Sequence, residues 1–211
     1  MIPTRAMQEA GEIDERWAPW SPGYFTPDET PGPAHVALAA APLPVAGYLS
    51  AGTELRSAFS EVHGHCSALY DVSGRYRYRI SYVWDPSRAR VCFVTLHASA
   101  APEARPDPIT EGCLRFARAW GYGAAEIVSL FAYRTTNAAV LHSADNAVGP
   151  GNDNAILAAA GAAHAVVAAW GTDSQWPLRE EQVRSLLRSN GITLHGFGVA
   201  ETPVTSRRQG P

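Results

Sequence analysis

Strand-like and helix-like segments alternate along the chain from residue 76 onward. Short apolar runs typical of buried strands occupy residues 90–96, 126–130, 165–170 and 193–197. Segments with helical spacing or helix-start signals lie between them, at residues 109–120, 152–163 and 178–189. Because strands that alternate with helices build crossovers between parallel strands, this order predicts an α/β domain, a three-layer sandwich with a mainly parallel central sheet.

The first strand of the series is the most regular. Over residues 76–84, large apolar side chains alternate with arginine, serine and valine, which is the period of two expected of a half-buried strand. A turn at residues 85–87 separates this segment from the apolar run at 90–96, so we expect an N-terminal hairpin. The same alternation places Arg75, Arg77 and Arg79 on one strand face, where they are available to an acidic partner.

Residues 1–50 differ in character from the rest of the chain. Prolines recur at short intervals between positions 19 and 44, and this spacing excludes long helices. Trp17, Trp20, Tyr24 and Phe25 lie in the same region, which is more aromatic than flexible linkers usually are. We expect an arm over residues 1–50 that covers the domain or a partner protein, with a disordered tail as the alternative, and a single α/β domain over residues 51–211.

All 17 basic residues of the chain are arginines, and the net charge is −3. The absence of lysine excludes a Schiff-base lysine and a P-loop lysine, and a chain of this charge does not predict a nucleic-acid groove. Arginine binds carboxylates and phosphates through its planar fork, so a small anionic ligand is compatible with the composition.

The spacing of the cysteines and the composition of the N-terminus predict the cellular compartment of the protein. Cys66, Cys92 and Cys113 form no CxxC pair, and the HGHC motif at residues 63–66 lacks a second ligand group. We expect no disulfide framework, no metal and no cofactor, and a cytoplasmic location. No signal-peptide pattern is present, and no apolar window reaches the roughly 18 residues of a membrane span, so we expect a soluble protein.

In an open α/β sheet, ligands bind beyond the carboxyl ends of the strands. His97 and Ser99 follow the first apolar run, Ser129 and Arg134 come late in or after the second, and Trp170 ends the third. His97 is the candidate acid or base because histidine titrates near neutral pH, with a hydrogen-bonded loop histidine as the alternative. Ser99 is a candidate nucleophile or, more simply, a hydrogen-bonding group. Arg134 is a candidate clamp for an anion, with a solvated surface arginine as the alternative.

Two further polar positions precede predicted helices. Asp107 is placed to cap the helix that begins near Pro108, with a catalytic carboxylate as the alternative. The glycine turn at residues 149–151 leads into Asn152 and Asp153 at a helix N-terminus, where backbone amides can receive an anion. Simple capping by Asn152 is the alternative there.

At these residues the chain resembles a bacterial family known as domain-of-unknown-function family 1643. The resemblance extends over roughly residues 74–198 and rests on an ordered series of motifs. They lie at residues 76–78, 84–86, 96–101, 107–117, 120–123, 130–134, 149–153 and 169–171. The family is more loosely similar to the uracil-DNA glycosylase-like α/β fold, whose ligand loops also follow the strands, although such an analogy does not carry function.

The departures from the family pattern fall on the presumed ligand edge. Where the family reads Leu-Asn-Pro-Ser-Thr-Ala, residues 96–101 read Leu-His-Ala-Ser-Ala-Ala, which keeps Ser99 and introduces His97. The asparagine usual before Leu130 is Ser129, and the C-terminal G-x-P-x-H-P stretch is not found around residues 201–203. These changes favour a divergent member recruited to secondary metabolism, such as antibiotic biosynthesis, that works with a partner protein.

The leading hypothesis is an enzyme, independent of metal and cofactor, that acts on a small polar and anionic metabolite. Acid/base chemistry would displace or eliminate a leaving group, as in a hydrolase, lyase or cyclase. The catalytic candidates are His97, Ser99 and Asp107, and the substrate-binding candidates are Ser129, Arg134, Asn152, Asp153 and Trp170. One alternative is a nucleotide or nucleic-acid binding protein related to N-glycosylases. Another is a non-catalytic subunit of a heteromeric enzyme, anchored through the arm.

Overall fold

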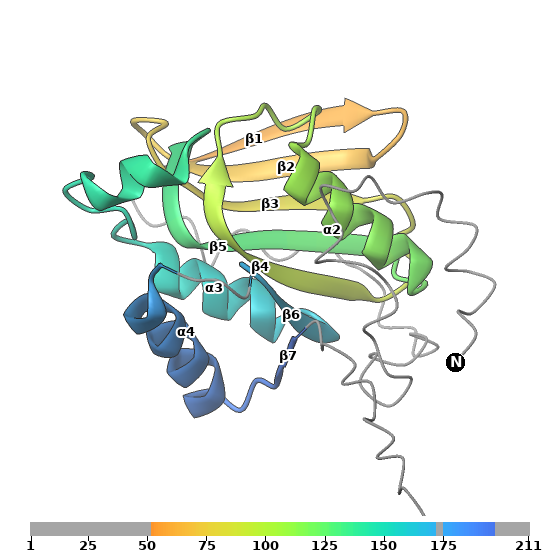
Figure 1. The fold of residues 1–211 in the computed structure, drawn as a ribbon. Coiled ribbons are helices and arrows are strands. Elements are labelled where there is room, and N and C mark those ends of the chain that lie inside the picture. Colours follow the sequence, from red (N-terminus) through yellow and green to blue (C-terminus); the bar gives the residue numbers. More distant parts are fainter. Residues whose placement is uncertain (1–51, 172–174, 197–211) are drawn as a thin grey trace, which may run out of the picture.

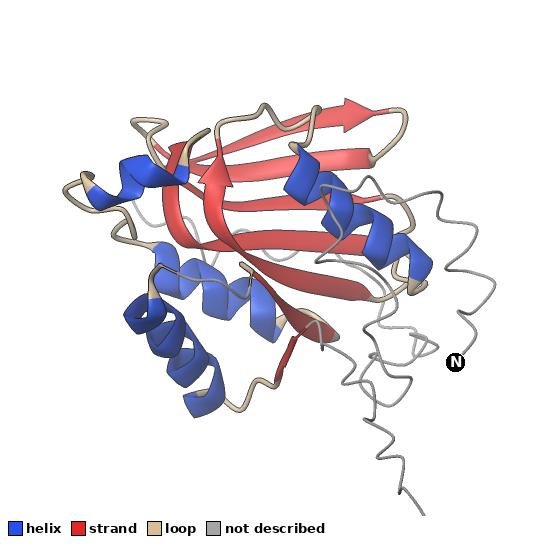
Figure 2. Ribbon diagram, viewed as in Figure 1, coloured by secondary structure: helices blue, strands red, loops and turns tan. Residues whose placement is uncertain are grey.

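The structure is a computed structural model that describes residues 52–171 and 175–196. These residues form an α/β fold in which one seven-stranded sheet carries three α-helices (Figures 1 and 2). The arm predicted over residues 1–50 lies outside the described residues, as does the segment around residues 201–203. None of the helices in the described ranges combines the length and the hydrophobicity that a membrane-spanning helix needs.

The predicted elements from residue 76 onward are all present, and the main difference is that the strand expected over residues 126–130 is longer. The strands are β1 (Thr53–Ser60), β2 (Gly64–Asp71), β3 (Arg77–Val83), β4 (Arg90–Ser99), β5 (Ala124–Thr135), β6 (Ala165–Ala169) and β7 (Leu194–Gly196). The helices are α2 (Pro108–Ala119), α3 (Asn152–Gly161), α4 (Pro177–Ser189) and the short 3-10 helix η4 (Ala138–His142).

The sheet is mixed. Its strand order is β1-β2-β3-β5-β4-β6-β7. Three neighbouring pairs, from β1 to β5, are antiparallel, and three, from β5 to β7, are parallel. The expectation of a mainly parallel sheet is therefore wrong for its first half, because β1, β2 and β3 form an antiparallel meander before the first crossover.

The predicted hairpin between β3 and β4 does not form. Strand β5 lies between them and pairs with both. The connection from β3 to β4 passes over Gly123, whose carbonyl accepts hydrogen bonds from the amides of Trp84 and Asp85. A Cβ atom at Gly123 would lie 1.9 Å from the Asp85 carbonyl oxygen, so only glycine allows this approach. The N-terminal hairpin of the sheet is instead β1–β2, where the sequence shows little apolar alternation.

Helices pack on both faces of the sheet. Helix α2 shares an apolar cluster with strand residues that include Phe93 and Ile127. Helices α3 and α4 share a second cluster with Cys92, Val94 and Val128, which alternate with the first set along the strands. Because β4 and β5 are covered on both faces, they read as continuous apolar runs in the sequence.

Strand β3 contains a β-bulge that separates two of its arginines. Leu69 of β2 pairs with Arg79 and the next residue, Tyr70, pairs with Arg77, so Tyr78 is the extra residue. Cross-strand partners point to the same face, and Leu69 and Tyr70 lie in different apolar clusters. Arg77 and Arg79 therefore point to opposite faces, and both are buried. The prediction of one shared, accessible arginine face is wrong.

Candidate functional site

The parallel strands β4, β5 and β6 end on one edge of the sheet, which we call the carboxyl edge. Helices α3 and α4 both begin on this side, as the ribbon shows (Figure 1). An edge of this kind combines strand-end side chains with helix N-termini, which favour polar and anionic groups. The site is therefore built from the residues that end these strands and begin these helices.

A pair of buried hydroxyl groups lies near the carboxyl edge, two residues before the regular pairing of β4 and β5 ends. Thr95 of β4 and Ser129 of β5 are cross-strand partners, and their hydroxyl oxygens lie 2.8 Å apart. The Thr95 hydroxyl also donates to the Val128 carbonyl at 3.2 Å. Ser129 must then donate to Thr95, so its hydroxyl links the two strands. Thr95 was not predicted, because one threonine in an apolar run gives no signal.

His97 lies two residues beyond Thr95, on the same side of β4. Its side chain is half-buried, and its Nδ1 atom lies 3.3 Å from the carbonyl oxygen of Ala98. When Nδ1 carries the proton and donates to that carbonyl, Nε2 presents a lone pair. This tautomer gives His97 the form needed by a general base.

The regular pairing of β4 and β5 ends at His97. His97 pairs with Phe131, but the next residue, Ala98, pairs with Arg134, so β5 carries two extra residues there. The amides of those residues, Ala132 and Tyr133, donate instead to the carbonyls of Val148 and Ala147. The bulge therefore bends β5 toward the loop that precedes α3 and loosens the sheet beside the imidazole.

Ser99 and Arg134 both hold loops at the carboxyl edge. The Ser99 hydroxyl oxygen accepts a hydrogen bond of 3.1 Å from the Ala101 amide. The Arg134 guanidinium donates to the carbonyls of Gly74 at 2.9 Å and Ala100 at 3.2 Å, and it lies over the Tyr70 ring. Two nitrogens of the Arg134 guanidinium thus donate to backbone carbonyls, which leaves fewer N–H groups to bind an anion.

Asn152 and Asp153 join the beginnings of α3 and α4 to β5. Asn152 is fully buried, and its side-chain amide donates to the carbonyls of Ser129 at 2.9 Å and Leu130 at 3.0 Å. Arg179 of α4 also donates to Leu130, at 2.9 Å, and forms an ion pair with Asp153 at 2.5 Å. The two helix starts are therefore tied to the strand just before its bulge.

Arg179 was missed by the sequence reasoning. It is 7% exposed although it lies in the first turn of α4, where the helix dipole disfavours a cation. A cation at that position is a signal of a specific partner, and here the partners are the Leu130 carbonyl and Asp153.

The glycine turn before α3 packs against two tyrosines. Gly149 has a φ of +85°, and a Cβ there would lie 2.9 Å from the Tyr76 ring. A Cβ on Gly151 would lie 3.4 Å from the Tyr78 ring, and the two tyrosine rings stack at 6.3 Å. Close packing thus explains the glycines, and the Tyr78 ring occupies the space in front of this helix N-terminus.

Asp107 and Trp170 each make contacts of their own. Asp107 caps α2: its carboxylate accepts hydrogen bonds from the amides of Ile109 and Thr110 and from the Thr110 hydroxyl. Trp170 is buried between the sheet and α4, where its ring lies 5.0 Å below the guanidinium of Arg184. In the described part of the chain, no hydrogen bond joins either residue to the other predicted site residues.

An aromatic group next to His97 was also missed. Phe131, the cross-strand partner of His97, meets the Trp176 ring at 5.5 Å. Trp176 in turn stacks on His142 of η4 at 4.8 Å. These rings give the carboxyl edge an apolar side. A tryptophan directly before Pro177 was the available signal, since Pro177 marks the helix start.

The buried charges of the sheet lie at the opposite end of β5. Glu126 is fully buried, accepts a hydrogen bond from the Ser81 hydroxyl at 2.8 Å and forms ion pairs with Arg90 and Arg79. Burial raises the pKa of Glu126, and the two guanidinium groups act against that rise. A glutamate inside an apolar run of the sequence was the available signal.

The three cysteines are free and buried. Burial raises the pKa of Cys66 to about 11 and raises the pKa values of Cys92 and Cys113 as well. Because the thiolate is the reactive form, these thiols are not suited to act as nucleophiles. In the described ranges no three His, Cys, Asp or Glu side chains are grouped in a way that could hold a metal ion.

The geometry defines a small α/β protein with a polar carboxyl edge bordered by aromatic rings. The family model for proteins of unknown function DUF1643 matches residues 77–207, and the chain belongs to this family. The match begins at the first residue of β3, so the β1–β2 hairpin precedes it. Comparisons with curated proteins and with solved structures find no match to the chain.

Proposed function

We propose that the protein is an enzyme that acts on a small polar, anionic metabolite at the carboxyl edge, without a metal or cofactor. His97 acts as the acid or base while a leaving group is displaced or eliminated, in a hydrolysis, elimination or cyclisation. The observation that carries the proposal is the placement of His97. It is half-buried beside the β5 bulge, and its contact with the Ala98 carbonyl favours the tautomer with a basic Nε2 atom.

The other candidates have supporting roles in this proposal. Ser99 provides a hydroxyl group two residues from His97, and Arg134 attracts the anionic group of the substrate from the neighbouring strand. Ser129, Asn152 and Asp153 position the substrate mainly through the strand and helix starts that they hold. Asp107 and Trp170 act through the start of α2 and through the contact with α4.

The wider setting is also part of the proposal. The departures from the family pattern at His97 and Ser129 favour a role in secondary metabolism, such as antibiotic biosynthesis in a bacterium. The aromatic arm over residues 1–50 would bind a partner protein, and the reaction would take place in the cytoplasm. The three-layer arrangement would be similar to that of the uracil-DNA glycosylase-like fold, with different chemistry at the edge.

The test compares the wild-type protein with the His97→Gln variant. Each protein is incubated with an anionic metabolite extract, and consumption and product formation are followed by mass spectrometry. Glutamine keeps the size and polarity of histidine but cannot transfer a proton near neutral pH, so we expect turnover to fall about 10²- to 10⁴-fold.

His65→Gln is the matched control, because His65 is exposed on β2 and lies toward the opposite end of the sheet. It pairs with Val83, whose partner Ala124 is the first residue of β5. This variant should keep full turnover. Equal turnover by the His97→Gln protein would contradict the proposal. Turnover that appears only after a co-purified partner is added, and that is unaffected by His97→Gln, would favour the non-catalytic subunit.

A further inference from the structure

We propose that the protein has a second ligand site, a cavity between α4 and β7 that binds a phosphomonoester through Arg184 and Arg188. The cavity measures about 440 Å³ and is lined by Arg184, Arg188, Gly191, Ile192, Thr193 and Leu194. Its volume lies in the range of small-molecule sites, roughly 300–1,000 Å³. The lining combines two cations with apolar side chains, which suits an organic anion better than a neutral ligand.

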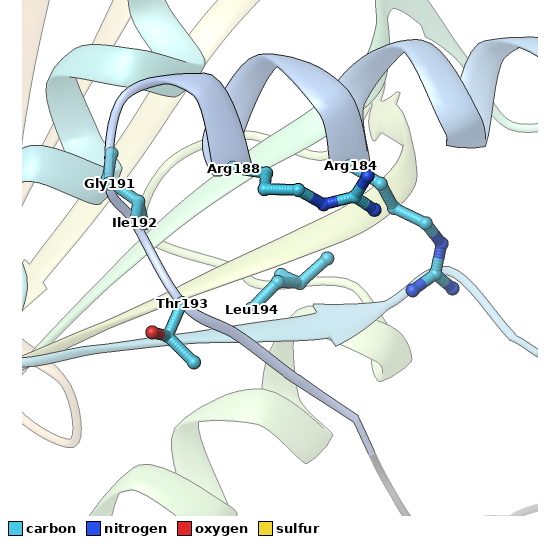
Figure 3. Close-up of a pocket in the computed structure, with 6 residues that line it drawn as sticks. All are labelled: Arg184, Arg188, Gly191, Ile192, Thr193 and Leu194. Atoms are coloured by element: carbon cyan, nitrogen blue, oxygen red, sulfur yellow. The ribbon is translucent and has the colours of Figure 1, made fainter.

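The two arginines share one side of α4. They are four residues apart, so they lie one above the other on the helix. Figure 3 shows both side chains leaving α4 on the side of Leu194, which lies below the Arg188 side chain. Two like charges at this spacing destabilise a helix slightly, and a dianion between the two guanidinium forks would remove that repulsion.

Arg184 is held in place before any ligand arrives. Its guanidinium lies 5.0 Å from the centre of the buried Trp170 ring, in a cation–π contact. A side chain fixed in this way loses less conformational entropy when it binds an anion. The contact also gives Trp170 a role at this cavity.

Among the residues that the structure describes, Arg188 has only a weak competing partner. The Glu181 carboxylate lies 3.9 Å away, and both side chains are well exposed to solvent. The Glu181 carboxylate also accepts a hydrogen bond of 3.0 Å from the Ser185 hydroxyl. An exposed pair at this distance contributes little, so a phosphate can replace Glu181 as the partner of Arg188.

Ile192 and Leu194 determine which class of phosphate compound the cavity is expected to prefer. Both are partly buried in the apolar cluster beneath α4, and both line the cavity. They offer apolar surface to the organic part of a ligand, next to the charged part. The site is therefore expected to prefer a phosphomonoester with an apolar group over inorganic phosphate.

The experiment measures binding of phenyl phosphate, inorganic phosphate and phenol to the full-length protein by isothermal titration calorimetry. We expect phenyl phosphate to bind more tightly than either fragment. Arg184→Gln and Arg188→Gln should each weaken binding about tenfold, since each removes a charge-assisted hydrogen-bonding group. Arg188→Lys should weaken it less, because the charge remains. Glu181→Gln should strengthen it, because Arg188 loses its competing carboxylate.

Arg75→Gln is the matched control, since Arg75 is exposed at the β2–β3 turn, and it should bind phenyl phosphate like the wild type. The His97→Gln variant should also bind normally, so this site and the proposed active site are tested separately. Circular dichroism checks that every variant is folded. Equal affinity for phenyl phosphate and inorganic phosphate, or unchanged binding by the Arg184→Gln/Arg188→Gln double variant, would overturn the proposal.

Discussion

The two ends of strand β5 differ in how far their polar groups are buried and paired. At its start, Glu126 is fully buried and is surrounded by Ser81, Arg79 and Arg90 on the neighbouring strands β3 and β4. At its end, the strand bulges, its carbonyls bind side chains of α3 and α4, and His97 beside it stays half-buried. At the start of β5 the charges are paired inside the sheet, whereas at the end of β5 polar groups lie beside a bulge.

This contrast separates polar groups that stabilise the fold from groups that can meet a ligand. A fully buried ion pair needs its partners, because an unpaired charge in the interior is very unfavourable. It is also closed to substrates. A strand that ends in a bulge gives up regular pairing and brings loops, helix starts and side chains to the same place. We therefore expect substitutions at the start of β5 to change stability, and substitutions at the end of β5 to change activity.

The largest effect on stability is expected for Glu126→Ala. It leaves Arg79 and Arg90 buried without their carboxylate, and breaking a buried ion pair in this way costs about 3–5 kcal/mol. Urea unfolding measures the loss. A cost below about 1 kcal/mol, the range of exposed pairs, would show that the start of β5 is not the closed structural end described above.

Arg179→Gln is expected to have the next largest effect. It removes the cation that joins the Leu130 carbonyl and Asp153, and hydrogen bonds to charged groups contribute about 1.5–3 kcal/mol. Asp153→Asn is the matched control. Because the Asp153 side chain is half exposed, its loss should cost less than about 1 kcal/mol by the same urea measurement. Equal costs for the two variants would mean that the Leu130 contact contributes nothing.

Asp107→Ala tests whether the carboxylate does more than cap α2. Loss of an N-cap costs about 1 kcal/mol, and Asp107→Ser, which keeps a capping oxygen, should recover most of it. If capping is its whole role, turnover by the folded variant will stay near the wild-type rate once a substrate is known. A large loss of turnover in the Asp107→Ser protein would instead place Asp107 in the chemistry.

The smallest effect is a pH dependence at Asp71, in the turn that Arg134 contacts. Although burial acts to raise the pKa of Asp71, hydrogen bonds from the Ser73 hydroxyl and from nearby amides, including that of Tyr76, lower it overall. A lowered folded-state pKa contributes stability that is present above the ordinary value of 3.8 and is lost as pH falls through the folded value.

Asp71→Asn should therefore be less stable than wild type at pH 6, and the difference should shrink as the pH falls below 3.8 and the aspartate of the wild type becomes protonated. Urea unfolding at pH 6 and in acid measures this difference. A difference that is the same at both pH values would show that the charge of Asp71 is not what stabilises the turn.

Local patterns in the sequence were enough to predict most elements of the fold. The apolar runs of β4 and β6, the Pro108 and Pro177 helix starts and the Asp107 cap all depend on neighbours within a few residues. The β3–β4 hairpin was predicted wrongly because strand order depends on which distant segment fits between two strands. Here β5 fits there, and Gly123 makes the close crossing possible.

The candidate site divides in the same way. In the sequence, His97, Ser99, Ser129 and Arg134 became candidates through their positions late in or after predicted strands, since ligands bind beyond the carboxyl ends of parallel strands. Thr95 had no signal in the sequence, and the signals for Arg179 and Trp176 were local and did not show their roles, because those roles depend on partners 30 or more residues away. The sequence also could not show that the Arg134 guanidinium donates hydrogen bonds to two backbone carbonyls.

The sequence by itself determined the α/β character and the positions of the helices, because these follow from residue periodicity and local capping; the carboxyl edge stays a prediction drawn from the same patterns. The tertiary structure decided the mixed strand order, the two bulges, the closed charge cluster around Glu126 and the cavity beneath Arg184 and Arg188. Each of these depends on which distant strands and helices pack together. That choice is set by burial and pairing over the whole domain, which no short segment of the chain contains.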